Sequence, residues 1–230
     1  PLTKWNAAIS TPDEVPAVVR KAFKIAESEK PGATHIELSE DLACLESHRQ
    51  PIQAVRVRRP DPNAKAIADA VALLKRAQKP LIIAGNGAIR QQAFGELRKF
   101  VGRHHIPVVN TFMGQGAVSD NSPESLYTIG LSFRDIVMEA VDQADLIMAV
   151  GYDIAEYAPD AWNPKMDKTI LHVDFTSAEV YTHYQPAVEV VADISAALRA
   201  LATSRSSESM RSCSDPKKGG GIGEPDTTAE

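Results

Sequence analysis

The sequence predicts an α/β protein built on a doubly wound, parallel sheet of the Rossmann type. Apolar runs without polar alternation, at residues 81–84 and 146–150, are typical of strands buried on both faces, as the strands of a parallel sheet are. These runs alternate with segments in which apolar residues recur at helical spacing. Strands that alternate with helices in this way indicate a parallel sheet covered by helices on both faces.

Composition bounds the class of protein. The 230 residues are 43% hydrophobic and 24% charged, as in an ordinary globular protein. A net charge of −5 offers no basic surface to nucleic acid or to an anionic membrane, so neither is an expected partner. No apolar run approaches the roughly 20 residues that cross a bilayer, and the first residues lack the features of a signal peptide. Cys44 and Cys213 could pair, but we favour free thiols in a reducing compartment and expect a cytoplasmic protein.

The first 43 residues contain a helix followed by a strand. Thr11 and Glu14 match a capping box around Pro12, and residues 35–38 form a short strand candidate. One helix and one strand cannot enclose a core. Residues 1–43 are therefore interpreted as the C-terminal end of a domain.

Two segments lack the periodicity of helices and strands. Residues 44–60 are predicted to be a linker, although its basic end could instead reach a cofactor phosphate as an anion-binding arm. Residues 204–230 are polar and rich in serine and glycine, and few of them can enter a core. They are predicted to be a disordered tail.

Residues 61–203 hold the main α/β pattern. A helix capped by Asn63 or Asp61 precedes the first buried strand, and strands and helices alternate from there. The expected helices are 63–77, 90–104, 135–144 and 194–201, and the expected strands are 81–84, 107–109, 146–150, 170–174 and 188–191.

A glycine turn, Gly85-Asn86-Gly87, follows the first of these strands. At such a turn, where a helix opens, backbone N–H groups suit a phosphate or pyrophosphate. The third glycine of the dinucleotide fingerprint is absent, because Arg90 stands in its place. A tight turn that needs positive φ would also explain both glycines, so a bare turn and a ligand-binding turn are alternatives.

The loop Thr111-Phe112-Met113-Gly114 follows the next strand. It lies at a carboxyl end, where open α/β sheets bind ligands. Gly114 and Gly116 would let a planar ligand approach the backbone. An ordinary loop with a buried Phe112 or Met113 is the alternative.

Acidic residues follow the later strands. Asp174 ends a strand, where an acid can accept hydrogen bonds from a ribose, and Asp193 is first of all a helix cap. Asp153, Glu156 and Asp160 match no tight metal cage, so an exposed acidic loop is the preferred interpretation. No arrangement of Ser, His and Asp, or of Cys and His, is typical of nucleophilic catalysis.

Taken in register, these segments resemble the central domain of thiamine diphosphate enzymes of the acetolactate synthase type. Residues 151–159, followed by Trp162-Asn163, are similar to the stretch G-Y-D-P-I-E-Y-x-P…W-N of the catabolic members. His172-Val173-Asp174, Tyr184-Gln185-Pro186 and Ala192-Asp193-Ile194 fall where that family has H-x-D, Y-Q-P and G-D-I. The resemblance covers roughly residues 1–203, and residues 31–42 resemble the close of the preceding pyrimidine-binding domain. The cofactor-facing positions that it implies are Gly85, Asn86, Gly87, Thr111, Phe112, Met113, Gly114, Asp174, Phe175, Asp193 and Ile194.

The resemblance implies a parent of three α/β domains that forms a homodimer or homotetramer and condenses two pyruvates to 2-acetolactate with loss of CO₂. It implies that the glutamate that activates the thiazolium lies upstream of Pro1. It also implies that the G-D-G…N motif for Mg²⁺ and the diphosphate lies downstream. Because this chain has neither, we expect no catalytic or metal-binding residues, no bound thiamine diphosphate and no turnover. The pyrimidine- and diphosphate-binding domains of the parent are its expected partners.

The same resemblance bears on whether this chain binds FAD. Biosynthetic members bind FAD through the glycine turn, a Thr-Leu-Met-Gly loop, a Gly-Met-His-Gly segment and an Arg-Phe-Asp-Asp-Arg segment. Residues 85–87 and 111–114 retain the first two, but residues 130–133 and 152–157 replace the others. The replacement removes two arginines, adds an acid and adds the bulk of Phe133. A negative residue beside a pyrophosphate is unfavourable, so the sequence weighs against FAD and leaves it as an alternative.

Two further classes of function are alternatives to the enzyme part. One is a stand-alone regulatory module that binds the ADP moiety of FAD, NAD or CoA. The other is a purely structural domain that spaces two catalytic domains. A nucleotide-dependent rise in thermal stability would separate the first from the second.

Overall fold

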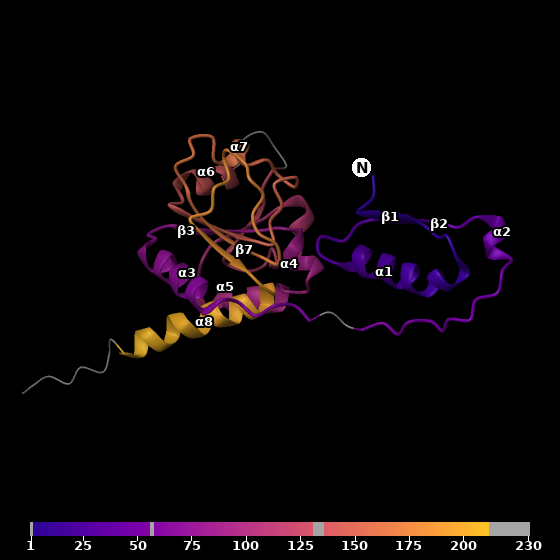
Figure 1. Ribbon diagram of the computed structural model, residues 1–230. Helices are drawn as coiled ribbons and strands as arrows, with labels where there is room; N and C mark the ends of the chain where they lie inside the picture. The colour runs from indigo at the N-terminus through magenta and orange to yellow at the C-terminus, as the bar shows by residue number, and fades with distance from the viewer. Residues whose placement is uncertain (1, 56–57, 131–135, 212–230) are drawn as a thin grey trace, which may run out of the picture.

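The computed structural model describes residues 2–55, 58–130 and 136–211, which fall into two parts (Figure 1). We call residues 2–43 the N-terminal unit and residues 58–211 the sheet unit. Between these parts, residues 44–55 contain no helix or strand.

The sheet unit is built on six parallel strands in the order β5-β4-β3-β6-β7-β8. Numbered along this unit, the order is 3-2-1-4-5-6, that of a doubly wound dinucleotide-type sheet, so the predicted fold class is confirmed. The strands are β3 (Pro80–Ala84), β4 (Val108–Asn110), β5 (Ser125–Thr128), β6 (Leu146–Val150), β7 (Thr169–Asp174) and β8 (Val188–Val191).

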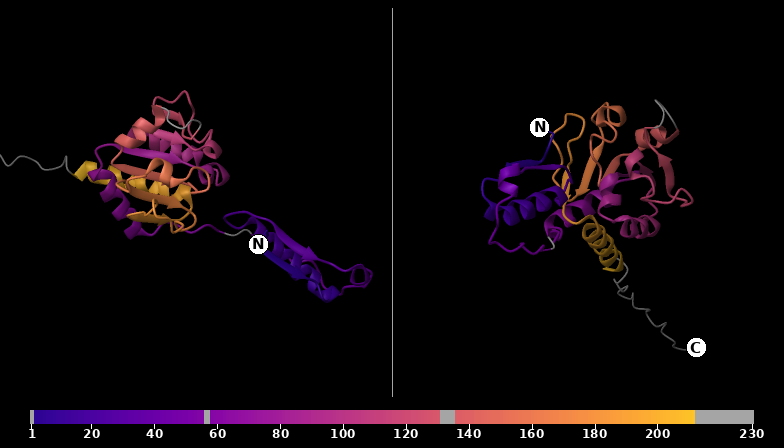
Figure 2. Two further views of the ribbon diagram at one scale, coloured as in Figure 1. Left: turned by 90° about the horizontal axis from the view of Figure 1, so that it is seen from above. Right: turned by 90° about the vertical axis from the view of Figure 1, so that its right-hand side faces the viewer.

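Helices cover both faces of this sheet (Figure 2). Ile82 and Met148 contribute to the core on one face, and their neighbours Ile83 and Ala149 contribute to the core on the other, as the period of two in a strand requires. The helices of the sheet unit are α3 (Ala64–Arg76), α4 (Asn86–Arg90), α5 (Phe94–His104), α6 (Ile136–Gln143), α7 (Pro159–Trp162) and α8 (Ile194–Arg211). Residues of α3, α5 and α8 belong to the first core, and residues of α6 and α7 to the second.

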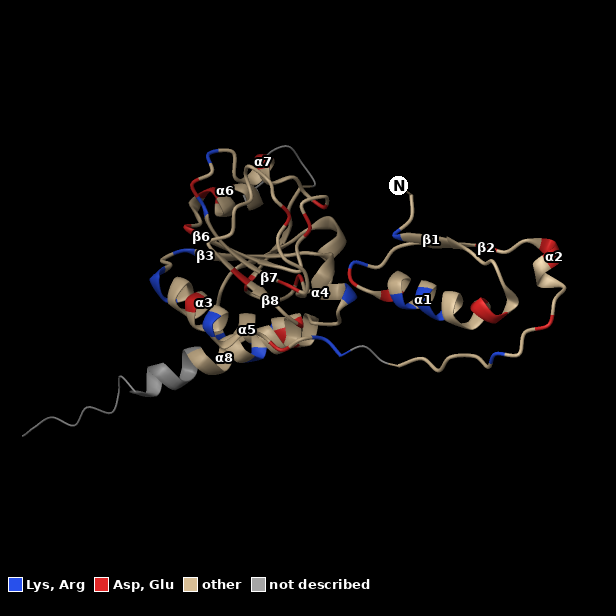
Figure 3. Ribbon diagram, in the orientation of Figure 1, with Lys and Arg blue, Asp and Glu red and all other residues tan. Residues whose placement is uncertain are grey.

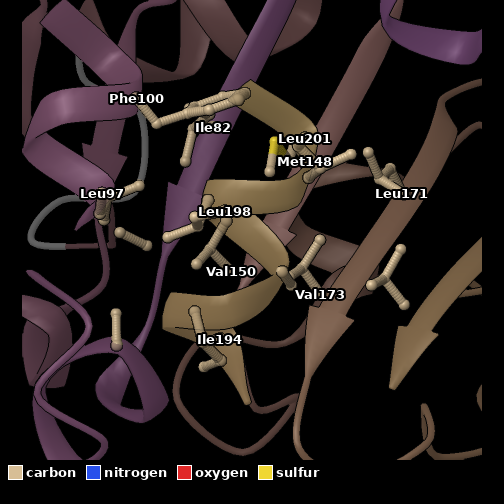
Figure 4. Close-up of a cluster of buried hydrophobic side chains, with 14 of the residues drawn as sticks. Ile82, Leu97, Phe100, Met148, Val150, Leu171, Val173, Ile194, Leu198 and Leu201 are labelled. Carbon is tan, nitrogen blue, oxygen red and sulfur yellow. The ribbon is translucent and has the colours of Figure 1, made fainter. Parts of the chain in front are cut away.

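The first core joins three helices to the centre of the sheet (Figure 4). Leu97 and Phe100 of α5 and Leu198 of α8 are buried in it. Burial of each such side chain stabilises a fold by about 1.5–3 kcal/mol. This core therefore holds the strands whose carboxyl ends form the candidate site.

The helix before β3 begins as predicted. Asn63 Oδ1 accepts hydrogen bonds from the backbone N–H groups of Lys65 (2.9 Å) and Ala66 (3.3 Å). Asn63 is therefore the cap of α3, and the alternative, Asp61, is not.

Three sequence predictions about the sheet unit were wrong in their boundaries. The helix expected at 90–104 begins only at Phe94, because Arg90 ends the preceding helix α4 and the left-handed backbone of Gln92 (φ 55°) separates the two. Strand β5 was missed. The tail predicted from residue 204 begins too early, because α8 continues to Arg211 with no glycine or proline to stop it, and residues 212–230 lie outside the described residues.

The N-terminal unit consists of two parallel strands and a helix. Strand β1 (Trp5–Ala8), which was not predicted, pairs with β2 (Thr34–Glu37), and α1 (Val15–Glu27) connects them. A short helix, α2 (Glu40–Ala43), follows. Among residues 2–55 only Ile9 and Ala22 are buried, so this unit has little core of its own.

The predicted capping box at the start of α1 is wrong. Thr11 makes no side-chain cap, and a short 3-10 turn (Pro12–Glu14) precedes the helix. The carboxylate of Glu14 accepts a hydrogen bond from the backbone N–H of Ser10 at 3.0 Å, so it fixes the preceding residue instead.

The described residues bear on the expectations about the cysteines and about membrane-spanning helices. Cys44 is an exposed free thiol, whereas Cys213 lies outside the residues described. None of the helices in the described part of the chain is both long enough and apolar enough to span a bilayer.

Candidate functional site

The candidate site lies where the order of the sheet reverses, between β3 and β6. In open α/β sheets, ligands bind outside the carboxyl ends of the strands at this switch point. Here the residues that follow β3, β4 and β6 meet: Gly85-Asn86-Gly87, the loop at Thr111, and residues 151–157. We call this place the switch-point crevice.

Backbone packs directly against backbone at the base of this crevice. The N–H of Gly87 donates to the carbonyl oxygen of Gly151 at 2.8 Å, and the N–H of Gly85 donates to that of Val150 at 2.9 Å. A Cβ on Gly85 would lie 2.6 Å from the Cα of Tyr152, and one on Gly87 would lie 2.6 Å from the Cα of Gly151. The glycines of the turn are therefore required by the close approach of two loops.

The bare-turn interpretation of these glycines was wrong in one respect. Gly85 has φ −103°, so it does not use the left-handed conformation. The residue that does is Gly151, with φ 59°, at the end of the neighbouring strand.

Glu156 occupies the mouth of the turn. Both of its carboxylate oxygens lie 3.0 Å from the backbone nitrogen of Asn86, and the hydroxyl of Thr111 donates a further hydrogen bond to the carboxylate. Burial raises the pKa of Glu156, and these hydrogen bonds oppose that rise. The preferred interpretation of an exposed acidic loop is therefore wrong at Glu156, whose carboxylate lies where the turn would meet a phosphate.

The loop after β4 is shaped by Thr111. Its Oγ1 accepts a hydrogen bond from the N–H of Gly114 at 2.9 Å and so caps the 3-10 turn Phe112–Gly114. Phe112 and Met113 are 64% and 55% exposed, so the alternative of a loop with a buried Phe or Met was wrong. Gly114 itself is buried against the backbone of Ala84.

Asp174 lies at the end of β7 and is 3% exposed. Its Oδ1 accepts a hydrogen bond from the N–H of the half-buried Phe175 at 2.6 Å and one from Nε2 of Gln91 at 3.4 Å. Burial raises the pKa of Asp174. The Oδ1 atom of Asp174 is therefore hydrogen-bonded within the protein.

Asp193 and Ile194 serve the start of α8. Asp193 Oδ1 accepts a hydrogen bond from the N–H of Ala196 at 2.9 Å, as a helix cap does, and the other oxygen lies 3.4 Å from Arg59. Ile194 is fully buried in the first core. The structure does not bring its side chain to the crevice.

A set of charges that the sequence analysis missed closes the crevice from the N-terminal unit. Glu29, whose side chain is only 7% exposed, lies 2.9 Å from Arg90 and 3.7 Å from Arg59. The neighbouring Lys30 lies 2.7 Å from Asp153 and 2.9 Å from Glu179. Figure 3 shows both signs of charge on the loop after α1, where it faces α4. The only sequence signal was the basic end of the linker, which includes Arg59.

These pairs affect the ionisation of Lys30. Burial acts to lower the pKa of its ammonium group, but hydrogen bonds to Asp153 and Glu179 outweigh burial and hold the pKa above its ordinary value. Lys30 therefore stays charged, and the two acids are not free to bind a cation.

An aromatic cluster behind the crevice holds the segment that carries Glu156. Trp162 Nε1 donates to the hydroxyl of Tyr152 at 3.1 Å, and that hydroxyl donates to the carbonyl of Tyr157. His172 Nε2 lies 2.9 Å from the carbonyl oxygen of Thr176, which can only accept. In the neutral ring Nδ1 is then the acceptor for the hydroxyl of Tyr184, at 2.8 Å.

A separate small cavity lies beside the crevice, next to the residues at the end of β7. The space bordered by Lys30, Asp153 and Asp174 has a volume of about 10 Å³, which is room for about one water molecule. Among the residues that the structure describes, no group of three or more His, Cys, Asp or Glu side chains could hold a metal ion.

The strand order and the glycine turn at the switch point define a dinucleotide-type α/β domain. The family model described as "Thiamine pyrophosphate enzyme, central domain" matches residues 67–201. This chain therefore belongs to the thiamine pyrophosphate enzymes, and the resemblance seen in the sequence is confirmed.

Acetolactate synthases are among its curated relatives. The chain is 31% identical over 200 residues to the acetolactate synthase of Bacillus subtilis, a match that covers 84% of this chain and 34% of the relative. It is 32% identical over 207 residues to the chloroplastic acetolactate synthase 2 of Nicotiana tabacum, covering 87% and 31%. It is 30% identical over 217 residues to a probable acetolactate synthase large subunit of Methanocaldococcus jannaschii, covering 87% and 35%. The chain thus spans about a third of the length of these relatives.

Proposed function

We propose that this chain is the central-domain part of a thiamine diphosphate-dependent acetolactate synthase. In that reaction two pyruvate anions and one proton give one 2-acetolactate anion and CO₂. The observation that carries the proposal is the 30–32% identity to acetolactate synthases over 84–87% of the chain, in register with the central-domain match.

The role proposed for the chain itself is structural. Thiamine diphosphate requires a Mg²⁺ site for its diphosphate, and the described residues offer no group of acids or histidines that fits one. Asp153 is paired with Lys30, and Glu156 with Asn86 and Thr111, so these acids are already engaged. The thiamine diphosphate and Mg²⁺ of the parent would be held by its pyrimidine- and diphosphate-binding domains.

The proposal also covers the oligomeric state and the cellular location of the parent. We place the parent in the cytoplasm as a homodimer or homotetramer. The sheet unit would act as a rigid spacer between the two cofactor-binding domains. Two well-packed cores and an all-parallel sheet give it the stiffness that such a role needs.

The test uses the purified chain and the product of its longer coding sequence. Each is incubated with pyruvate, thiamine diphosphate and Mg²⁺, and acetolactate is measured as acetoin after acid decarboxylation. We expect acetolactate from the longer product and none from this chain. Acetolactate made by this chain alone would overturn the structural role, and a folded longer product that makes none would overturn the proposed reaction.

A further inference from the structure

The switch-point crevice is occupied by the chain's own charged groups. We propose that it is an internal docking site, in which Glu156 and the Glu29–Lys30 loop take the places that the phosphates of a dinucleotide would take, and that this chain therefore binds no FAD there. The inference concerns residues of this chain only and does not depend on the reaction of the parent.

The first step is the position of Glu156. A dinucleotide pyrophosphate at this kind of turn accepts hydrogen bonds from the backbone N–H groups that open the helix. Here the N–H of Asn86 already faces both oxygens of Glu156, at 3.0 Å each, and the hydroxyl of Thr111 donates to the same carboxylate. A pyrophosphate would have to displace a carboxylate and approach its negative charge.

The second step is the pair of arginines beside the turn. Guanidinium groups are the usual cationic partners of phosphate, because their planar set of donors matches its oxygens. Arg90 and Arg59 lie 2.9 Å and 3.7 Å from the buried carboxylate of Glu29. Their charge is therefore compensated from within the chain, so Arg59 is not free to contact a phosphate as part of the anion-binding arm that was an alternative for the linker.

The third step is space. The ring of Tyr157 lies against Gly130, where an added Cβ would come within 2.7 Å of it. On the other side, Lys30 bridges Asp153 and Glu179 at 2.7 Å and 2.9 Å, so the loop after α1 lies against the segment that follows β6. FAD therefore does not match the donors of this turn, because Glu156 already accepts from the backbone N–H of Asn86 and from Thr111.

The exclusion of FAD is tested on the full chain. Equilibrium dialysis against FAD, with ADP as a second probe, is expected to show no saturable binding up to about 1 mM. Binding of one FAD per chain at micromolar concentration would overturn the proposal.

The docking of the loop is tested by hydrogen exchange, read by mass spectrometry on peptides that cover residues 28–33 and 86–92. Glu29→Gln removes the charge that compensates Arg59 and Arg90, and the exposed Glu27→Gln is its matched control. We expect exchange in both segments to become at least about fivefold faster in E29Q and to stay unchanged in E27Q. Lys30→Gln, which breaks the other half of the contact, is expected to act on residues 28–33 in the same way. Exchange in E29Q and K30Q equal to that of E27Q would overturn the docking.

Discussion

Replacement of Gly151 by alanine should destabilise the sheet unit by several kcal/mol. Gly151 has φ 59°, a conformation that costs an L-residue about 1–2 kcal/mol. Its Cβ would also lie 2.6 Å from the carbonyl carbon of Gly87, which is backbone and cannot turn away as a side chain would. Forcing extra volume into such packing costs about 1–3 kcal/mol. The two effects add to about 2–5 kcal/mol.

The measurement is urea unfolding followed by the fluorescence of the buried Trp162 and by far-ultraviolet circular dichroism. The matched control is Gly102→Ala in α5, where an added Cβ has no atom within 4 Å. There the same substitution should be neutral or should stabilise the fold by up to about 1 kcal/mol, because alanine has the higher helix propensity. The reasoning fails if the free energy of unfolding of G151A lies within about 0.5 kcal/mol of the wild-type value, or if G102A is equally damaging.

Three further predictions concern single hydrogen-bonding groups. Asn63→Ala removes the cap of α3 and should lower the free energy of unfolding by about 1 kcal/mol, whereas Asp61→Ala should leave it unchanged; urea unfolding of both variants decides this. Tyr152→Phe removes the acceptor of Trp162 and the donor to the carbonyl of Tyr157, so thermal and urea unfolding should show a loss of about 1–3 kcal/mol; an unchanged stability would contradict these contacts. For the exposed Asp145, a small loss of solvation acts to raise the pKa, but hydrogen bonds from the backbone N–H groups of Gln78 and Lys79 outweigh it and hold the pKa below its ordinary value. The stability that Asp145 contributes is therefore present above the pKa of the unfolded state and is lost as the pH falls through the pKa of the folded state. Asp145→Asn should flatten the acid side of the curve of unfolding free energy against pH. An acid side equal to that of the wild type would contradict this account.

The parts of the fold that could be predicted from the sequence are those whose signal is local. Strand β6 was located to the residue, because a continuous apolar run identifies a buried parallel strand. Strand β8 at the edge of the sheet was also located to the residue, from its three valines. Strand β5 was missed because it is short, lies at the edge of the sheet and begins and ends with the polar residues Ser125 and Thr128. The division between α4 and α5 was missed because its cause, a left-handed Gln92, has no sequence signature comparable to glycine.

The sequence predicted which loops lie at the carboxyl ends of the strands, but it did not predict the side-chain contacts made there. The glycine turn and the loop at Thr111 were expected at the carboxyl ends of neighbouring strands, and both are found there. The contact of Glu156 with Asn86 joins residues 70 positions apart, and that of Glu29 with Arg90 joins residues 61 apart. Spacing along a chain carries no information about such pairs. They depend on which strands become neighbours and on how the N-terminal unit lies against the sheet.

The strand order has a consequence for how this polypeptide acquires its shape during synthesis. Strand β3, near the middle of the sheet, pairs with β4, which is made soon after it, and with β6, which ends only at Val150. A nascent chain shorter than that can assemble only β5-β4-β3, and the backbone N–H and C=O groups on one edge of β3 are left without partners. Bare edges invite pairing between molecules, and late closure over a long stretch of sequence slows folding. C-terminal truncations that stop before residue 150 should therefore accumulate as aggregates, whereas chains that include β6 have the partner that covers this edge.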